Sequence, residues 1–269
     1  MADFFLETVQ KAGVQPEDTV LVVCGGSYDQ QTLEVAGVKD VVISNVSDRG
    51  SPPETYGNYR WEIQDAEDIS HPDQSFDWVI VHAGLHHCRS PHRGFCEMLR
   101  VSTRGIIIVE ARDSLVVGAA KRLGLVPEFE MEPIILSGGK YGGVRDTPIP
   151  NFIYRWTEKE ARKTVASFDP AFQHQVLFNY GWRLPLQRIS MSRNRAVRAA
   201  VRLADAGKFL LTALLPHQGN LFGIVVKKSG EVRPWIKRGA DNQMAPDLDY
   251  IGKKYDPSRY SVTGHLPVR

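Results

Sequence analysis

Four stretches of the chain are apolar at nearly every position, and the lengths between them suit helices: 19–26, 40–45, 76–84 and 104–112. A strand that is apolar on both faces is covered on both, unlike one with alternating polar positions. The alternation of such strands with helical segments predicts βαβ units and a parallel sheet. We therefore expect an α/β fold with helices on both faces of the sheet.

The 269 residues, 42% of them apolar, are sufficient to bury a full core, which excludes disorder over most of the length. We expect one domain, 1–269, with an insert at 113–160, an added helix at 192–215 and a tail at 230–269. Thr157 and Glu160 form the sequence pattern of a capping box and predict that a helix starts there. Alternating Phe152, Tyr154 and Trp156 would lie on one face of an extended segment, where they suit either a sugar ring or core packing.

The N-terminal segment is acidic and helix-like, and no apolar run approaches the ~18 residues of a membrane span. Three cysteines are too few for a disulfide framework and fit a reducing compartment. Both observations lead us to expect a cytoplasmic protein without a membrane span.

Charge is distributed unevenly. Residues 1–180 hold 17 Lys+Arg and 25 Asp+Glu, a net −8, and residues 181–269 hold 16 and 6, a net +10. The basic part could attract an anionic substrate, a nucleic acid or a membrane surface, or complement the acidic part within the fold or across a homodimer. Because no nucleic-acid motif accompanies the dispersed arginines, we favour the complementary role and expect no nucleic-acid partner.

Ligands of open α/β sheets bind at the carboxyl ends of the strands. The first strand ends in a glycine-containing turn whose backbone can approach an anionic group. The second ends at Asn45, which can donate to and accept from a ribose diol. Asp65 and Ala66 follow the third and suit the amino group and ring of an adenine, and His82 ends the fourth. The predicted cofactor-binding residues are therefore Cys24, Gly25, Gly26, Ser27, Asn45, Asp65, Ala66 and His82.

The segment FDWVIVHAGLHHCRSPHRGFCEMLRVSTRGIIIVEAR, residues 76–112, together with Asp65-Ala66-Glu67, resembles the class I S-adenosylmethionine (SAM)-dependent methyltransferases of the methyltransferase domain 11 type. The resemblance covers about 15–112 and, more weakly, the strand in 219–230. It implies a Rossmann-like, seven-stranded, mostly parallel sheet with an antiparallel last strand, and SAM as cofactor.

The first turn departs from that family. Cys24 and Tyr28 replace two glycines of the usual Gly-x-Gly-x-Gly, Val22 stands where many members have an acid, and Asn45 replaces the ribose-binding acid. Asp29 would contact the methionine amine or merely cap the following helix, two roles that the sequence leaves equally open.

Three residues are the predicted catalytic group: His86, His87 and Glu110. A histidine of ordinary pKa suits removal of a hydroxyl proton at neutral pH, and a carboxylate on its other ring nitrogen fixes the tautomer. His87 could instead point into solvent. A zinc site of His86, Cys88, His92 and Cys96 lacks the usual ligand spacing. Glu110, Asp113 and Asp146 could instead hold Mg²⁺ near a sugar diol, although loop carboxylates in solvent explain them equally simply. We therefore assign no residue as a metal ligand.

The segments HAGLHHCRSPH and PNFIYRWTEKE resemble those of sugar and polysaccharide O-methyltransferases. The resemblance implies O-methylation of a small carbohydrate-containing acceptor, and methylated polysaccharide biosynthesis is one pathway that would contain such a step. A non-sugar natural product is the alternative acceptor. A nicotinamide-dependent oxidoreductase and a non-catalytic binding protein of the same fold are the rivals from other classes.

Overall fold

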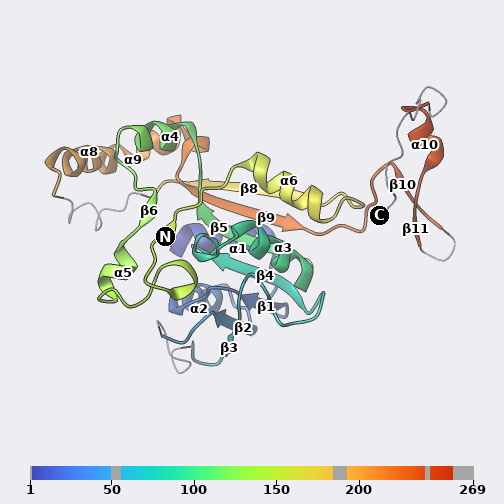
Figure 1. The fold of residues 1–269 in the computed structure, drawn as a ribbon, viewed down its shortest axis with the longest axis horizontal. Helices are drawn as coiled ribbons and strands as arrows, with labels where there is room; N and C mark the ends of the chain where they lie inside the picture. The colour runs from blue at the N-terminus through green and yellow to red at the C-terminus, as the bar shows by residue number, and fades with distance from the viewer. Residues whose placement is uncertain (1, 50–55, 184–192, 240–242, 257–269) are drawn as a thin grey trace.

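The computed structural model describes residues 2–49, 56–183, 193–239 and 243–256. A seven-stranded sheet forms its centre, in the spatial order β3-β2-β1-β4-β5-β9-β8 (Figure 1). Strands β1 to β5 pair in parallel, and β9 is antiparallel to both of its neighbours. This confirms the predicted Rossmann-like sheet and its antiparallel last strand. The strands are β1 Thr19–Val22, β2 Asp40–Asn45, β3 Arg60–Ile63, β4 Phe76–His82, β5 Ser102–Ala111, β8 Gln175–Gly181 and β9 Leu221–Lys227.

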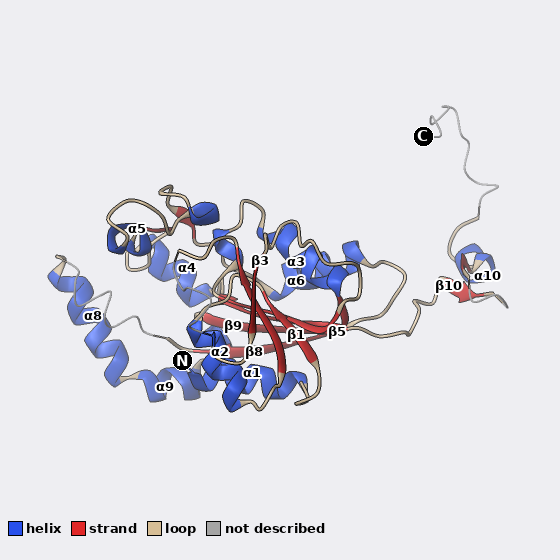
Figure 2. Ribbon diagram, turned by 90° about the horizontal axis from the view of Figure 1, so that it is seen from below, coloured by secondary structure: helices blue, strands red, loops and turns tan. Residues whose placement is uncertain are grey.

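Helices cover both faces of the sheet (Figure 2). On one side α1 (Ala2–Ala12) and α2 (Ser27–Val35) contribute Phe5, Val9 and Leu33 to a buried cluster. On the other, α3 (Pro91–Val101) and α6 (Glu158–Phe168) contribute a second cluster, which includes Phe95, Met98 and Val165. The central strands β1, β4 and β5 are thus covered on both faces, which explains why their sequences lack alternation.

The start of α6 is where the sequence predicts it. Thr157 Oγ1 accepts a hydrogen bond from Glu160 N at 3.2 Å, and Glu160 Oε2 accepts one from Thr157 N at 3.1 Å. The two side chains satisfy backbone groups that the first helical turn leaves without partners, so the predicted capping box is confirmed.

The helix predicted over 192–215 is wrong as a single element. Within the described part, it is α8 (Arg195–Ala206) followed by α9 (Lys208–Leu214), with Gly207 between them. Glycine is a poor helix former because it loses most backbone entropy, so a break here is inexpensive.

The 113–160 segment adds short elements above the carboxyl ends of the strands, namely α4 (Leu115–Arg122), β6 (Phe129–Glu130), α5 (Glu132–Leu136), η3 (Val144–Asp146) and β7 (Asn151–Phe152). The 230–269 segment, predicted as a C-terminal tail, contains β10 (Ile236–Arg238), β11 (Met244–Pro246) and α10 (Leu248–Gly252). Residues 257–269 of that tail lie outside the described residues.

The alternating aromatics do not form one surface. Trp156 is fully buried against Phe95, and the Tyr154 hydroxyl donates to Glu160 at 2.6 Å, whereas Phe152 is half exposed. Of the two roles open from sequence, core packing is the one that Tyr154 and Trp156 have. In the described residues, no helix has the length and apolar character needed to cross a membrane.

Candidate functional site

A cavity of about 300 Å³ lies at the carboxyl ends of β1, β2, β3 and β4, where the topology predicts a ligand site. The other side is formed by α5, η3 and the loop between them, through Pro133, Gly142, Gly143, Arg145 and Asp146. The sheet side is lined by Cys24, Asn45, Val46, Gln64, Asp65, Ala66, Glu67, Ala83, Gly84, His87 and Cys88. Of the predicted cofactor-binding residues, this lining includes Cys24, Asn45, Asp65 and Ala66.

Two loops cross closely at the floor of the cavity. Cys24, after β1, has φ 53°, and Ala83, after β4, has φ 52°, both in the left-handed region that non-glycine residues rarely adopt. A Cβ added to Gly84 would lie 2.4 Å from Cys24 Cβ. The variant first turn therefore puts an ordinary side chain where glycine is favoured, and Gly84 opposite makes the room. Strained backbone at such a crossing is typical of functional sites.

The glycines of the first turn have different tasks. A Cβ on Gly25 would meet Val22 and Ile43 within 3 Å, so packing alone requires glycine there, whereas one on Gly26 would meet only Asp29 Oδ2, at 4.0 Å. The space beside Gly26 is therefore not filled by the protein, and a ligand could occupy it. Gly25, Gly26, Ser27 and His82 were predicted to bind cofactor and are absent from the described lining of this cavity.

Asp29 caps α2, since its Oδ2 accepts from Gly26 N at 2.8 Å. Its other oxygen, Oδ1, is buried without a hydrogen-bond partner, and His82 Nδ1 lies 3.7 Å away. Burial raises the pKa of Asp29 to about 7, against the opposing hydrogen bond from Gly26. The buried oxygen that lacks a donor fits a cationic or N–H group, such as the amine of SAM.

Asn45 and Asp65 already have partners. Asn45 Nδ2 donates to Gly25 O at 3.2 Å and holds the first turn against the end of β2. Asp65 Oδ1 accepts from Glu67 N at 2.9 Å, and its Oδ2 lies 2.6 Å from Arg145 Nη2. The guanidinium of Arg145, which lines the side of the cavity opposite the sheet, therefore forms an ion pair with the carboxylate that is predicted to bind adenine.

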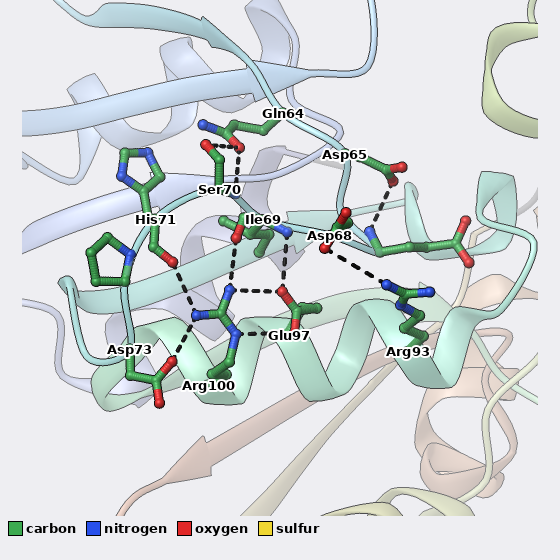
Figure 3. Close-up of polar contacts among 12 residues, drawn as sticks. Gln64, Asp65, Asp68, Ile69, Ser70, His71, Asp73, Arg93, Glu97 and Arg100 are labelled. Carbon is green, nitrogen blue, oxygen red and sulfur yellow. Dashed lines mark hydrogen bonds and ion pairs between the residues drawn. The ribbon is translucent and has the colours of Figure 1, made fainter.

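The segment after Asp65 is fixed by Arg100 of α3 (Figure 3). Its guanidinium donates to the carbonyls of Ile69 at 2.7 Å and His71 at 3.0 Å, and pairs with Asp73 and Glu97 at 2.8 Å. A planar fork with five donors can hold a loop in this way. The loop that follows Asp65 is thus held against α3.

His86 lies between two glutamates. Its Nδ1 is 2.8 Å from Glu110 Oε2, as predicted, and its Nε2 is 3.2 Å from Glu130 Oε2. Burial disfavours the charged ring, but the glutamates outweigh it and raise the pKa of His86 to about 10. With both nitrogens protonated, the ring donates to both carboxylates and has no lone pair for an incoming proton.

His87 has the opposite character and faces the cavity. Burial and the charge of His86 lower its pKa. Its Nδ1 lies 3.3 Å from the Gly143 carbonyl, which can only accept, so the proton is assigned to Nδ1. The unprotonated Nε2 lies 3.4 Å from Glu130 Oε2. His87 is therefore a neutral ring beside a carboxylate, rather than a ring in solvent.

His82 packs away from the predicted catalytic residues His86, His87 and Glu110. Its ring stacks on Phe5 with centroids 5.1 Å apart and lies 4.9 Å from Tyr28. Burial lowers the pKa of His82 to about 4, so the ring is neutral. It supports the first turn from behind.

Glu130 and Arg145 were missed by the sequence analysis. Both lie in the 113–160 segment, outside any motif, and reach the site only because β6 and η3 fold over the strand ends. A helix-capping residue can be recognised from the residues next to it in sequence. No such local pattern marks Glu130 as a partner of His86.

The two metal-ligand sets considered from the sequence, neither of which we predict as a site, are not assembled among the described residues. His92 of the zinc set packs on Tyr154 and Trp156, and Asp146 of the magnesium set accepts from Ser47. In the described part of the chain, the group with ligand atoms close enough for an ion is His86, His87 and Glu130, all within 4.8 Å of one another. The proton of His86 Nε2 already occupies the contact with Glu130.

Comparison with known proteins agrees with the fold. Residues 22–109, which are 88 of 269, match the family described as a methyltransferase domain. A methyltransferase of Haloferax volcanii, in complex with the Trm112 methyltransferase activator, has a similar structure at TM-score 0.52 and 14% identity, covering 86% of this chain and 92% of that one. A magnesium protoporphyrin IX methyltransferase from Synechocystis PCC 6803 with bound SAH gives TM-score 0.49 and 16% identity, covering 85% and 82%. No curated protein sequence matches.

The chain therefore carries, over residues 22–109, a segment that matches a methyltransferase domain, and this segment lies within the Rossmann-like sheet.

Proposed function

We propose that the protein is an O-methyltransferase in which His87 removes the proton of an acceptor hydroxyl. The observation that carries this proposal is the neutral His87 ring, which lines the cavity beside the Glu110–His86–Glu130 network. SAM binds along the same strand ends, with Asn45, Asp65 and Ala66 as the residues that hold its adenosine.

Each histidine has a distinct role in this proposal. His87 Nδ1 donates to the Gly143 carbonyl, which orients the ring and leaves Nε2 to accept the proton. Glu130, 3.4 Å from that nitrogen, stabilises the imidazolium that forms. His86 stays protonated and holds Glu130 in place, and Glu110 fixes His86 while also accepting from Leu85 N at 2.7 Å.

A small carbohydrate-containing acceptor is the substrate class that we favour. Phe129 and Phe152, half exposed and with ring centroids 5.5 Å apart, form a pair on β6 and β7, and β7 contacts the turn that holds both histidines. Aromatic rings suit the apolar face of a sugar, and the carboxylates nearby suit its hydroxyls. This pair takes the place of the predicted surface of Phe152, Tyr154 and Trp156. A non-sugar natural product with a hydroxyl would use the same base.

The test is single-turnover methyl transfer from labelled SAM to a panel of sugars, lipids and phenols, followed by variants on the best acceptor. His87→Ala should lower the rate by roughly 10²- to 10⁴-fold with SAM affinity little changed. His71→Ala, a histidine paired with Glu62 away from the cavity, is the matched control and should keep the wild-type rate.

A wild-type rate in His87→Ala would contradict the general-base role. Loss of activity on chelation, with restoration by Mg²⁺, would replace that role with metal activation of the hydroxyl. SAM binding without transfer to any acceptor would favour the non-catalytic alternative, and transfer to phenols but not sugars would keep the base and remove the carbohydrate assignment.

A further inference from the structure

A group of leucines is exposed on the surface beside the site. Leu115 of α4, Leu123 directly after α4, Leu203 of α8, and Leu210 and Leu214 of α9 each have more than 60% of their surface exposed. Single exposed apolar side chains are common, but five on neighbouring helices are not. We call these five residues the leucine surface.

The helices that carry the leucine surface are connected. The turn η4 (Pro216–Gln218) contacts both α4 and α9, and α9 contacts α8. Gln218 fixes this arrangement, because its carbonyl accepts from Ser114 Oγ at 2.8 Å and its Oε1 accepts from Leu115 N at 3.0 Å. The five leucines thus lie on one assembly rather than on unrelated parts of the molecule.

Cations accompany the leucines. Residues 193–215 contain five Lys+Arg and one Asp, a net charge of +4. Arg195, Arg198 and Arg202, at helical spacing, lie along one face of α8, with Arg195 and Arg202 exposed. Basic residues on one face and apolar residues beside them are typical of helices that lie in a membrane interface.

The assembly is placed where such a contact would matter. Ala111 at the end of β5 pairs with Leu221 at the start of β9, so α4 and η4 leave the sheet at the same edge as the cavity. In both views α8 projects from the body of the protein (Figures 1 and 2). A surface in contact with this assembly would lie beside the cavity.

We propose that α4, α8 and α9 dock on the surface of an anionic lipid bilayer. The leucine surface inserts among the acyl chains near the headgroups, and the arginines of α8 bind lipid phosphates. The charge of the assembly selects an anionic surface over a neutral one. This contact is interfacial, and it does not depend on which acceptor the enzyme methylates.

The experiment is co-sedimentation of the full chain with vesicles of phosphatidylcholine, with and without phosphatidylglycerol. Binding should be at least about tenfold stronger to the anionic vesicles and should weaken in high salt. The charge variant Arg195→Glu/Arg202→Glu should lose about tenfold or more of that binding. The variant Leu203→Ser/Leu210→Ser should lose the part of vesicle binding that persists in high salt.

The matched control is Lys237→Glu/Lys253→Glu, which makes the same change of net charge on β10 and beside α10, and should keep wild-type binding. SAH-induced thermal stabilisation of each variant shows that the body remains folded. Equal loss in the control would reduce the effect to net charge and overturn the proposal. Absence of anionic-vesicle binding would also overturn it. A dimer that Leu203→Ser/Leu210→Ser dissociates, without vesicle binding, would assign the leucine surface to a second copy of the chain.

Discussion

At the scale of single residues, neighbours in sequence have opposite protonation states. His86 and His87 are adjacent, yet the pKa of the first is raised to about 10 and that of the second is lowered. Glu110 and Glu130 contact both nitrogens of His86, so its charge is stabilised in spite of burial. That charge then disfavours a second one on His87. Two histidines that are adjacent in sequence thus form one charged ring and one neutral ring.

The pH dependence of methyl transfer follows from His87. Because only the neutral ring accepts a proton and its pKa is lowered, the rate should rise with pH through an apparent pKa below the ordinary 6.5 and then stay level. His86 should add a change only near pH 10, where it loses its proton. A rate profile under saturating SAM measures this, and a midpoint above 7 would contradict it.

Asp29 makes ligand-free stability depend on pH. Its folded pKa of about 7 exceeds the ordinary 3.8, so the folded state binds more protons between these values and loses stability as pH rises through them. Asp29→Asn keeps an acceptor for Gly26 and cannot ionise. We expect the variant to be more stable than the wild type at pH 8, by up to roughly 4 kcal/mol at ~1.4 kcal/mol per pKa unit. At pH 4, where Asp29 is protonated in the folded state, the two proteins should have about the same stability.

Urea unfolding at several pH values measures the effect, and Asp77→Asn is its control. Partial burial opposes ionisation of Asp77, but hydrogen bonds from Thr19 and Thr103 hold its pKa below the usual value. Its stability contribution is present at neutral pH and lost in acid, so the substitution should destabilise at pH 8. Equal responses of the two variants would contradict the burial argument.

At the scale of elements, the turn η3 covers the cavity at the strand ends. Arg145 and Asp146 have φ of 51° and 58°, and Asp146 accepts from Ser47 Oγ at 2.5 Å and from Gly142 N at 3.1 Å. The turn therefore connects the loop after β2 with Asp65 after β3. A ligand that uses Asp65 must displace or share the guanidinium of Arg145.

Arg145→Ala should therefore speed association of SAM, by about two- to fivefold for loss of a partly exposed ion pair. Stopped-flow binding measures the rate. Arg93→Ala is the matched control, because Arg93 pairs with Asp68 outside the cavity at 3.7 Å. An unchanged association rate in Arg145→Ala would mean that Asp65 is reached without moving the turn.

At the scale of the whole molecule, cofactor binding and stability are linked. SAH binds the folded state, so an excess of about 100-fold over Kd should stabilise the protein by about 2.7 kcal/mol. Gly26→Val should abolish this stabilisation while folding persists, because a Cβ there contacts no part of the protein closer than 4.0 Å. Thermal unfolding with and without SAH measures both. Full stabilisation of the variant would place the cofactor away from the first turn.

The sheet could be predicted from short-range patterns in the sequence. Strands such as 104–112 are apolar on both faces, and the Thr157–Glu160 capping box is a local signal, so both were predictable from short-range patterns. The strand ends also predicted the edge on which the cavity lies, because parallel topology brings those ends together. The Glu110 contact with His86 followed from the same rule, since β4 and β5 are neighbours.

The contacts and protonation states of the site residues could not be predicted from the sequence, because they depend on long-range contacts. Glu130 and Arg145 come from a segment without periodicity. Glu130 contacts His86, 44 positions away in the chain, and Arg145 contacts Asp65, which is 80 positions away. The difference between His86 and His87 depends on burial and on charges brought in by β6, which no local pattern encodes. Backbone patterns are short-range and can be read along the chain, whereas the pKa of a buried group depends on every charge packed around it.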